Sequence, residues 1–309
     1  MRLTNSQSSR IGRAGKRKRD VAGVDVIYPE PTEEDAESPR KRPQTRLEVI
    51  DYSVAIDGEM DELTDVEVGI PIVLSRMWDE VPETGARLGR TGVADINTFR
   101  VSLPKVITVA QLHALYPHDP TFVDRELREC EAGGRVRRFV VNSGGDLIML
   151  ADEYHRKLAQ SIEGAGEHAG VLRRFAQLVR ERPADTRLSA DDLERGGIDR
   201  AEASAVLAAG YLVLSGQPDA YYVSVPNIGS FLKLLTRLRT WIVRHLGRSQ
   251  WKELLEKMLV ERWVGGVKAR WHDFRGVRLE WALMALKGEG YIEPFGTPAG
   301  RAWKLTGKR

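Results

Sequence analysis

Four short segments contain residue types that phosphoryl transfer uses, and each one lacks a part that the reaction needs. A glycine-rich run at 85–92 has the wrong glycine spacing for a phosphate-covering loop. Asp57 ends a strand-like segment at the place where a phosphate-binding lysine would stand. Residues 154–157 lack a catalytic aspartate, and residues 273–276 insert Arg275 into what would be a metal-binding triplet. Such near misses arise by chance, and their order does not build a kinase.

No other set of residues points to catalysis. The six histidines form no His-x-x-x-His pair, and no Gly-x-Ser-x-Gly segment is present. The one cysteine, Cys130, excludes an internal disulfide and a cysteine zinc site. We therefore expect no catalytic residue, no metal and no cofactor.

Cationic side chains are concentrated in the last third of the chain. Residues 231–309 contain 17 Lys and Arg against 7 Asp and Glu, a net charge of +10, whereas the whole chain has a net charge of +3. A local excess of this size favours a surface that binds a polyanion, although a solvated face is the alternative. The expected nucleic-acid-binding residues are Lys233, Arg237, Arg244, Arg248, Arg262, Lys268, Arg270, Arg275 and Arg278.

Residues 1–68 have no apolar periodicity and alternate basic and acidic blocks, which predicts a disordered tail. Short basic clusters of this kind are typical of nuclear localisation signals, and a basic arm that touches DNA or only solvates the tail is the alternative. The clusters are Lys16, Arg17, Lys18 and Arg19, and Arg40, Lys41 and Arg42. We expect a nuclear protein.

Three copies of one pattern organise the rest of the chain. In each copy an apolar helix runs into a glycine and then into a short apolar strand, at Gly134, Gly210 and Gly290, which are 76 and 80 residues apart. The glycine permits the left-handed residue that ends a helix, and a second apolar strand follows each time. Helix, stop and hairpin form the second half of a winged helix.

The pattern predicts a mostly α chain with short β-hairpins (α+β), as three tandem winged-helix domains after the disordered tail. The expected domains are 69–150, 151–228 and a basic, DNA-binding 229–309. We further expect a helix over Trp251–Leu259, from apolar residues at i, i+3, i+4, i+7 and i+8. The third helix of the last domain is the one expected in the major groove. No apolar run is long enough to cross a membrane.

Three segments resemble a known family. They are residues 103–107 through 134–136, residues 225–233 with a Val-Pro-x-x-Gly-x-Phe-x-Lys pattern, and residues 251–255. In this order they resemble the serine/threonine-protein kinase nineteen family, over roughly residues 70–309. The resemblance implies three winged helices, nuclear DNA binding and a role in transcription-coupled nucleotide excision repair with RNA polymerase II and TFIIH. It implies DNA contacts at Lys233, near Arg248 and at Arg262, and it places Trp263 where the family has an arginine.

Three hypotheses follow. The first is a non-enzymatic nuclear scaffold that binds double-stranded DNA through its C-terminal domain, with polymerase and repair factors as partners. The second is a protein kinase, as the family name implies. The third is a protein–protein adaptor whose basic face meets an acidic partner.

Overall fold

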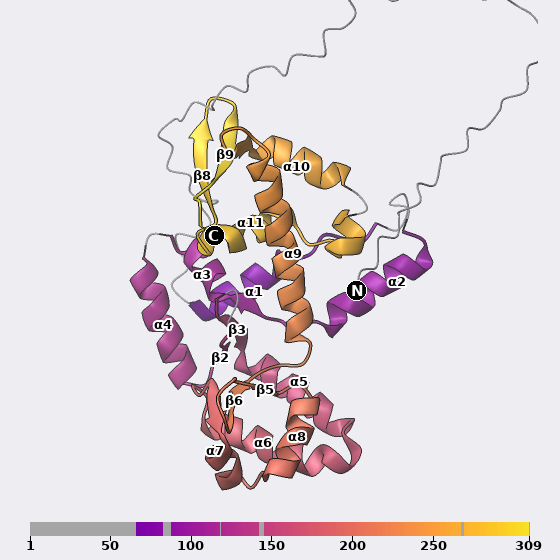
Figure 1. Cartoon of the computed structure of the whole chain (residues 1–309), viewed down its shortest axis with the longest axis vertical. Coiled ribbons are helices and arrows are strands. Elements are labelled where there is room, and N and C mark those ends of the chain that lie inside the picture. Colours follow the sequence, from indigo (N-terminus) through magenta and orange to yellow (C-terminus); the bar gives the residue numbers. More distant parts are fainter. Residues whose placement is uncertain (1–65, 83–87, 118, 142–144, 267–268, 309) are drawn as a thin grey trace, which may run out of the picture. The chain divides into compact units, whose positions relative to one another are not determined.

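The computed structural model describes residues 66–82, 88–117, 119–141, 145–266 and 269–308 (Figure 1). In this part of the chain most residues are helical and the strands form small antiparallel sheets, so the predicted α+β class is confirmed. Residues 1–65, with both basic clusters, lie outside the described residues. The expected tail ended at residue 68, but the first helix already begins at Val66 because Val66, Gly69 and Ile70 are buried.

The described elements fall into three groups in chain order, which we call repeats one, two and three. Repeat one contains α1 (Val66–Ser75), α2 (Arg90–Ser102), β1 (Ile107–Thr108), α3 (Val109–Leu115), α4 (Pro120–Ala132), β2 (Val136–Phe139) and β3 (Leu147–Leu150). Repeat two contains α5 (Ala151–Glu163), the short helix η2 (Gly166–His168), α6 (Ala169–Glu181), β4 (Arg187–Ser189), α7 (Ala190–Arg195), α8 (Arg200–Ala208), β5 (Leu212–Leu214) and β6 (Ala220–Val223). Repeat three contains α9 (Ile228–Gly247), β7 (Glu253–Leu255), α10 (Glu256–Gly265), the π-helical turn η3 (Ala269–Asp273), α11 (Leu279–Gly288), β8 (Ile292–Thr297) and β9 (Gly300–Leu305).

Each repeat has a three-stranded antiparallel sheet with the same topology. The strand orders are β1-β3-β2, β4-β6-β5 and β7-β9-β8, so the strand that comes last in the chain is always central. The hairpins pair Val136 with Leu150, Leu212 with Val223, and Ile292 with Leu305. The predicted order of helix, glycine and strand is therefore confirmed at all three places. The assignment of each repeat as a separate winged-helix domain stays a prediction.

Local sequence explains where the helices stop and start. Gly134, Gly210 and Gly290 have φ values of 68°, 81° and 74°, which is the left-handed region that glycine enters without steric cost. The side chains of Asp119 and Asp199 cap the N-termini of α4 and α8 by accepting a backbone N–H.

The helix expected over Trp251–Leu259 is wrong in its first half. Residues Glu253–Leu255 form β7, which pairs with β9 through Leu254 and Trp303, and α10 begins only at Glu256. Met258 is 41% exposed rather than part of the core. The helical spacing of apolar residues was overridden because β7 completes the sheet of repeat three.

One apolar core runs through the described repeats. Buried residues from Val66 to Trp303 form a contiguous cluster with members in all three repeats. α11 packs on α3 so closely that a Cβ added at Gly288 would lie 1.8 Å from the carbonyl oxygen of Ala110. Repeats one and three are therefore joined by backbone-to-backbone contact.

No helix within the described residues combines the length and the apolar character needed to cross a membrane. The same residues contain no cluster of His, Cys, Asp or Glu side chains with the geometry of a metal site.

Candidate nucleic-acid interface

A row of cations runs along the exposed face of α9 and ends at Arg248, the residue that follows the helix. The opposite face of this helix is buried, through Phe231, Leu234, Leu235, Leu238, Ile242 and Leu246. Lys233, Arg237, Arg244 and Arg248 are spaced four, seven and four residues apart, and at 100° per residue they fall within about 60° of one another. The row is about 22 Å long, from the 1.5 Å rise per residue. We call these four residues the α9 stripe.

The stripe is not neutralised by carboxylates of the described chain. All four side chains are exposed, and no ion pair with a described residue is present at any of them. Arg239 on the same helix shows the contrast, because it bonds to the hydroxyl of Tyr291 at 3.0 Å and pairs with the buried Glu289 at 3.5 Å. Arg239 is therefore structural, whereas the stripe presents its charges to solvent.

An aromatic cluster on repeat three lies beside the stripe and links α9 to α10. Trp241 stacks on His245 with a centroid distance of 3.9 Å and meets Trp263 edge-on at 4.9 Å. Trp263 in turn stacks on Phe274 at 4.9 Å. Trp263 is 4% exposed, so this position, where the family resemblance places an arginine, is a core residue here.

The electrostatics of His245 show that cations from two helices converge. Burial lowers the pKa of the His245 imidazole, and the nearby charges of Arg248, Arg262 and Arg244 lower it further, against the hydrogen bond between Nδ1 and the Trp241 carbonyl oxygen. Arg262 is exposed near the end of α10, with no ion pair to a described residue. The edge-on contact of Trp241 with Trp263, the residue after Arg262, brings the end of α10 beside α9, so we count Arg262 as a fifth cation with the α9 stripe.

A shallow hollow of about 390 Å³ lies beside the middle of the stripe. It is lined by Arg237, Arg244, Thr236, Thr240, Trp241, Phe274 and Asp273. The two arginines, the hydroxyls and the aromatic rings suit a phosphate with its sugar, whereas the Asp273 carboxylate in the same lining opposes it. The sequence prediction of the binding residues did not include the two threonines or Trp241. Their helical spacing from the arginines could have identified them as neighbours on α9.

The other predicted cations form a separate group around Asp79. Arg270 and Arg278 pair with its carboxylate at 2.5 and 3.3 Å, and Arg275 lies over the ring of Phe99 at 5.3 Å. Backbone bonds complete this junction between repeats one and three, including Asp79 N–H to the Gly276 carbonyl at 2.8 Å. These three arginines therefore make contacts within the protein and do not present free charges to solvent. Lys268, the remaining predicted cation, lies outside the described residues.

The expectation that the third helix of the last repeat enters the major groove is wrong. Seven of the ten residues of α11 are buried, and the helix is covered by α3 of repeat one. Gln111 of α3 also donates to the carbonyl of Trp281 at 3.5 Å. A helix buried in this way cannot lie in a DNA groove without dismantling the core.

The comparisons with known proteins give the family. A family model described as "Inactive serine-threonine protein kinase 19" matches residues 74–305. The chain belongs to this family. The match covers repeats one to three almost completely, and the family description itself names the kinase as inactive.

Relatives of the inactive serine-threonine protein kinase 19 family are similar at about a quarter of positions. "Serine/threonine-protein kinase mug51" of Schizosaccharomyces pombe is 25% identical over 221 residues, covering 69% of this chain and 70% of that protein. "Winged helix repair factor 1" of Homo sapiens is 25% identical over 191 residues, covering 59% of this chain and 73% of that protein. The protein of the same name from Mus musculus is 24% identical over 191 residues. The names of the last two connect the family with winged helices and repair.

Proposed function

We propose that this protein is a non-enzymatic nuclear factor that binds double-stranded DNA through the α9 stripe and Arg262. The observation on which this depends is the row of four exposed cations on one helix face, extended by a fifth from α10. Exposed cations in a row fit the phosphate backbone, which supplies most of non-specific DNA affinity. Membership of a family with relatives named as repair factors supports the same function.

We also propose the domain type, the cellular process and the partners that go with this DNA binding. Repeats one to three are winged-helix units, and the protein acts in transcription-coupled nucleotide excision repair alongside RNA polymerase II and TFIIH. Its location is the nucleus, directed by the basic clusters at 16–19 and 40–42. A kinase reaction is not part of this proposal, since the family description calls the kinase inactive.

Because α11 is buried, the proposed contacts are to phosphates and not to base edges. Phosphate contacts position a protein on DNA without selecting a sequence. Five contacts give a slope of log K against log salt of about −4.5. Two duplexes of the same length and different sequence should bind with affinities that agree within about threefold, since no base-edge contact distinguishes them.

The test is a salt-titrated fluorescence-anisotropy measurement on the full chain with a labelled duplex. Changing Lys233, Arg248 and Arg262 together to Glu should weaken binding by about 100-fold or more at low salt. The melting temperature should stay within about 3 °C of the parent, because exposed substitutions change stability little. Unchanged affinity would refute the proposed interface.

The matched control is Arg173→Glu, an exposed arginine on α6 with no ion pair to a described residue. This variant also loses positive charge, but outside the α9 stripe, so its DNA affinity should stay within about twofold of the parent. If the parent chain binds no duplex at low salt and retains a protein partner, the adaptor hypothesis replaces this one. Transfer of labelled γ-phosphate that is lost on Asp273→Ala would favour the kinase.

A further inference from the structure

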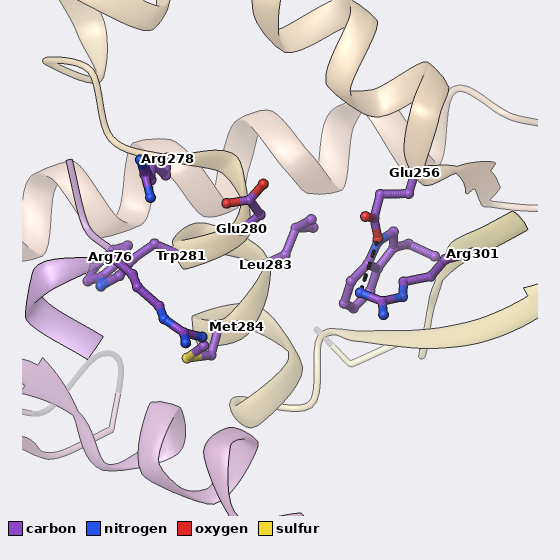
Figure 2. A pocket seen from close by; sticks show the side chains of 9 residues that line it. Arg76, Glu256, Arg278, Glu280, Trp281, Leu283, Met284 and Arg301 are labelled. Atoms are coloured by element: carbon purple, nitrogen blue, oxygen red, sulfur yellow. Dashed lines mark hydrogen bonds and ion pairs between the residues drawn. The ribbon is translucent and has the colours of Figure 1, made fainter. Parts of the chain in front are cut away.

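A second hollow, unrelated to the α9 stripe, lies where the end of α1 meets α11 and β9. Its volume is about 250 Å³, and its lining combines arginines with a tryptophan and methionine floor. Figure 2 shows Arg76 extending toward Met284, with Arg278 and Glu280 above and with Arg301 and Glu256 on the opposite side. We call this hollow the Arg76 pocket.

The charges of the Arg76 pocket leave room for a carboxylate. Arg76 is half-buried and has no ion pair with a described residue. Of the two glutamates, Glu256 already accepts from the indole N–H of Trp303 at 2.8 Å and lies 3.8 Å from Arg301. Glu280 is exposed and has no ion pair with a described residue, Arg76 included. The indole nitrogen of Trp281 is buried without a hydrogen-bond partner in a residue that is 1% exposed. An arginine with no ion pair to a described residue and apolar side chains therefore line one hollow.

The sequence just before α1 has the complementary chemistry. Residues 47–57 contain Glu48, Asp51 and Asp57 and no Lys or Arg, and most of their other side chains are apolar. Carboxylates suit Arg76, and apolar side chains suit Met284 and the tryptophans.

The length of chain is sufficient to connect the two. Arg76 lies about 15 Å along α1 from Val66, at 1.5 Å per residue. The eight residues 58–65 span up to about 26 Å when extended. Val68, Ile72 and Arg76 form one i, i+4, i+8 row on α1, and Val68 is 43% exposed, so an apolar path leads from the helix start to the pocket.

We infer that the Arg76 pocket binds residues 47–57 of the same chain, with an acidic side chain against Arg76. The short connection makes this an intramolecular event with a high effective concentration, so a modest set of contacts is sufficient. The inference does not depend on DNA binding, because the α9 stripe contributes no residue to the pocket.

Hydrogen–deuterium exchange on the full chain tests this inference. The amides of residues 47–57 should exchange about tenfold or more slowly than in a free peptide of the same sequence. Arg76→Glu should remove this protection, and Arg76→Glu combined with Asp51→Lys should restore it, because the ion pair is then reversed. Arg173→Glu is the control and should leave the protection unchanged.

Three outcomes would overturn the inference. One is exchange of residues 47–57 at the free-peptide rate in the parent chain. Another is protection that persists in Arg76→Glu when its melting temperature equals that of the parent. The third is protection that appears only after a second protein is added, which would assign the pocket to a partner.

Discussion

At the scale of single residues, Arg137 shows how a strand residue of repeat one becomes part of the core. Its side chain is 3% exposed and lies over the ring of Tyr154 at 5.4 Å. Burial lowers the pKa of Arg137, against the nearby charge of Asp185, and carbonyl oxygens surround its guanidinium. It donates to the carbonyls of Val179, Arg182, Pro183 and Asp185 at 2.9, 3.2, 3.3 and 2.9 Å. Arg137 thus ties β2 of repeat one to the end of α6 in repeat two.

Arg137→Met should lower the free energy of unfolding by about 3 kcal/mol, because four carbonyl groups lose a charged donor. Arg137→Lys should recover only part of this, since one ammonium cannot reach all four oxygens. Urea denaturation monitored by circular dichroism measures both. The exposed Arg128→Met on α4 is the control, and an equal loss in that variant would contradict the role of Arg137.

The pKa of His245 reports on the convergence of cations at the stripe. Arg262→Gln should raise this pKa, because one of the charges that lower it is removed, and Arg173→Gln should leave it unchanged. An NMR titration of the imidazole Cε1 proton gives the value directly. No change in Arg262→Gln would separate α10 from the proposed interface.

His245 also makes stability depend on pH in a defined direction. Its folded-state pKa is lowered, so its contribution is present above about pH 6.5, the unfolded value, and is lost as the pH falls through the folded value. His245→Gln should therefore lose less stability than the parent between about pH 7 and about pH 5, as measured by urea denaturation at each pH.

At the scale of elements, the contact between α11 and α3 buries α11, so α9 is the helix that we propose to contact DNA. A substitution at Gly288, the last residue of α11, tests this contact. Gly288→Ala should cost about 2 kcal/mol or more, since its Cβ would overlap the backbone of Ala110. Gly229 of α9 has no atom within 4 Å of an added Cβ, so Gly229→Ala should stabilise by about 0.5 kcal/mol. Chemical denaturation of both variants provides the comparison, and equal effects would contradict the close approach.

At the scale of the whole described chain, the core determines how the protein unfolds. Apolar side chains of all three repeats belong to one cluster, and the Asp79 junction adds ion pairs between repeats one and three. We expect a single cooperative transition, in which the calorimetric and van't Hoff enthalpies agree. Two separated transitions in calorimetry would instead indicate independent domains. Residues 229–309 alone would expose the apolar face of α11, so DNA binding is best measured on the full chain.

Much of the secondary structure could be predicted because its causes are local. A left-handed glycine after an amphipathic helix depends on the sterics of one residue, so Gly134, Gly210 and Gly290 could be assigned from their neighbours. Helix caps at Asp119 and Asp199 depend on residues three positions away. The exception at Glu253–Leu255 arose because β9, which pairs with it, lies some fifty residues later.

The sequence by itself determined the repeated helix–glycine–strand order, the family and the α9 stripe, because steric limits and helical spacing act within a few residues. Only the tertiary structure separated the cations into two groups. Arg270 and Arg278 pair with Asp79, which lies 191 and 199 residues earlier in the chain. Packing against α3 buries α11. Contacts over such distances depend on how whole faces pack, and no spacing along the chain encodes them.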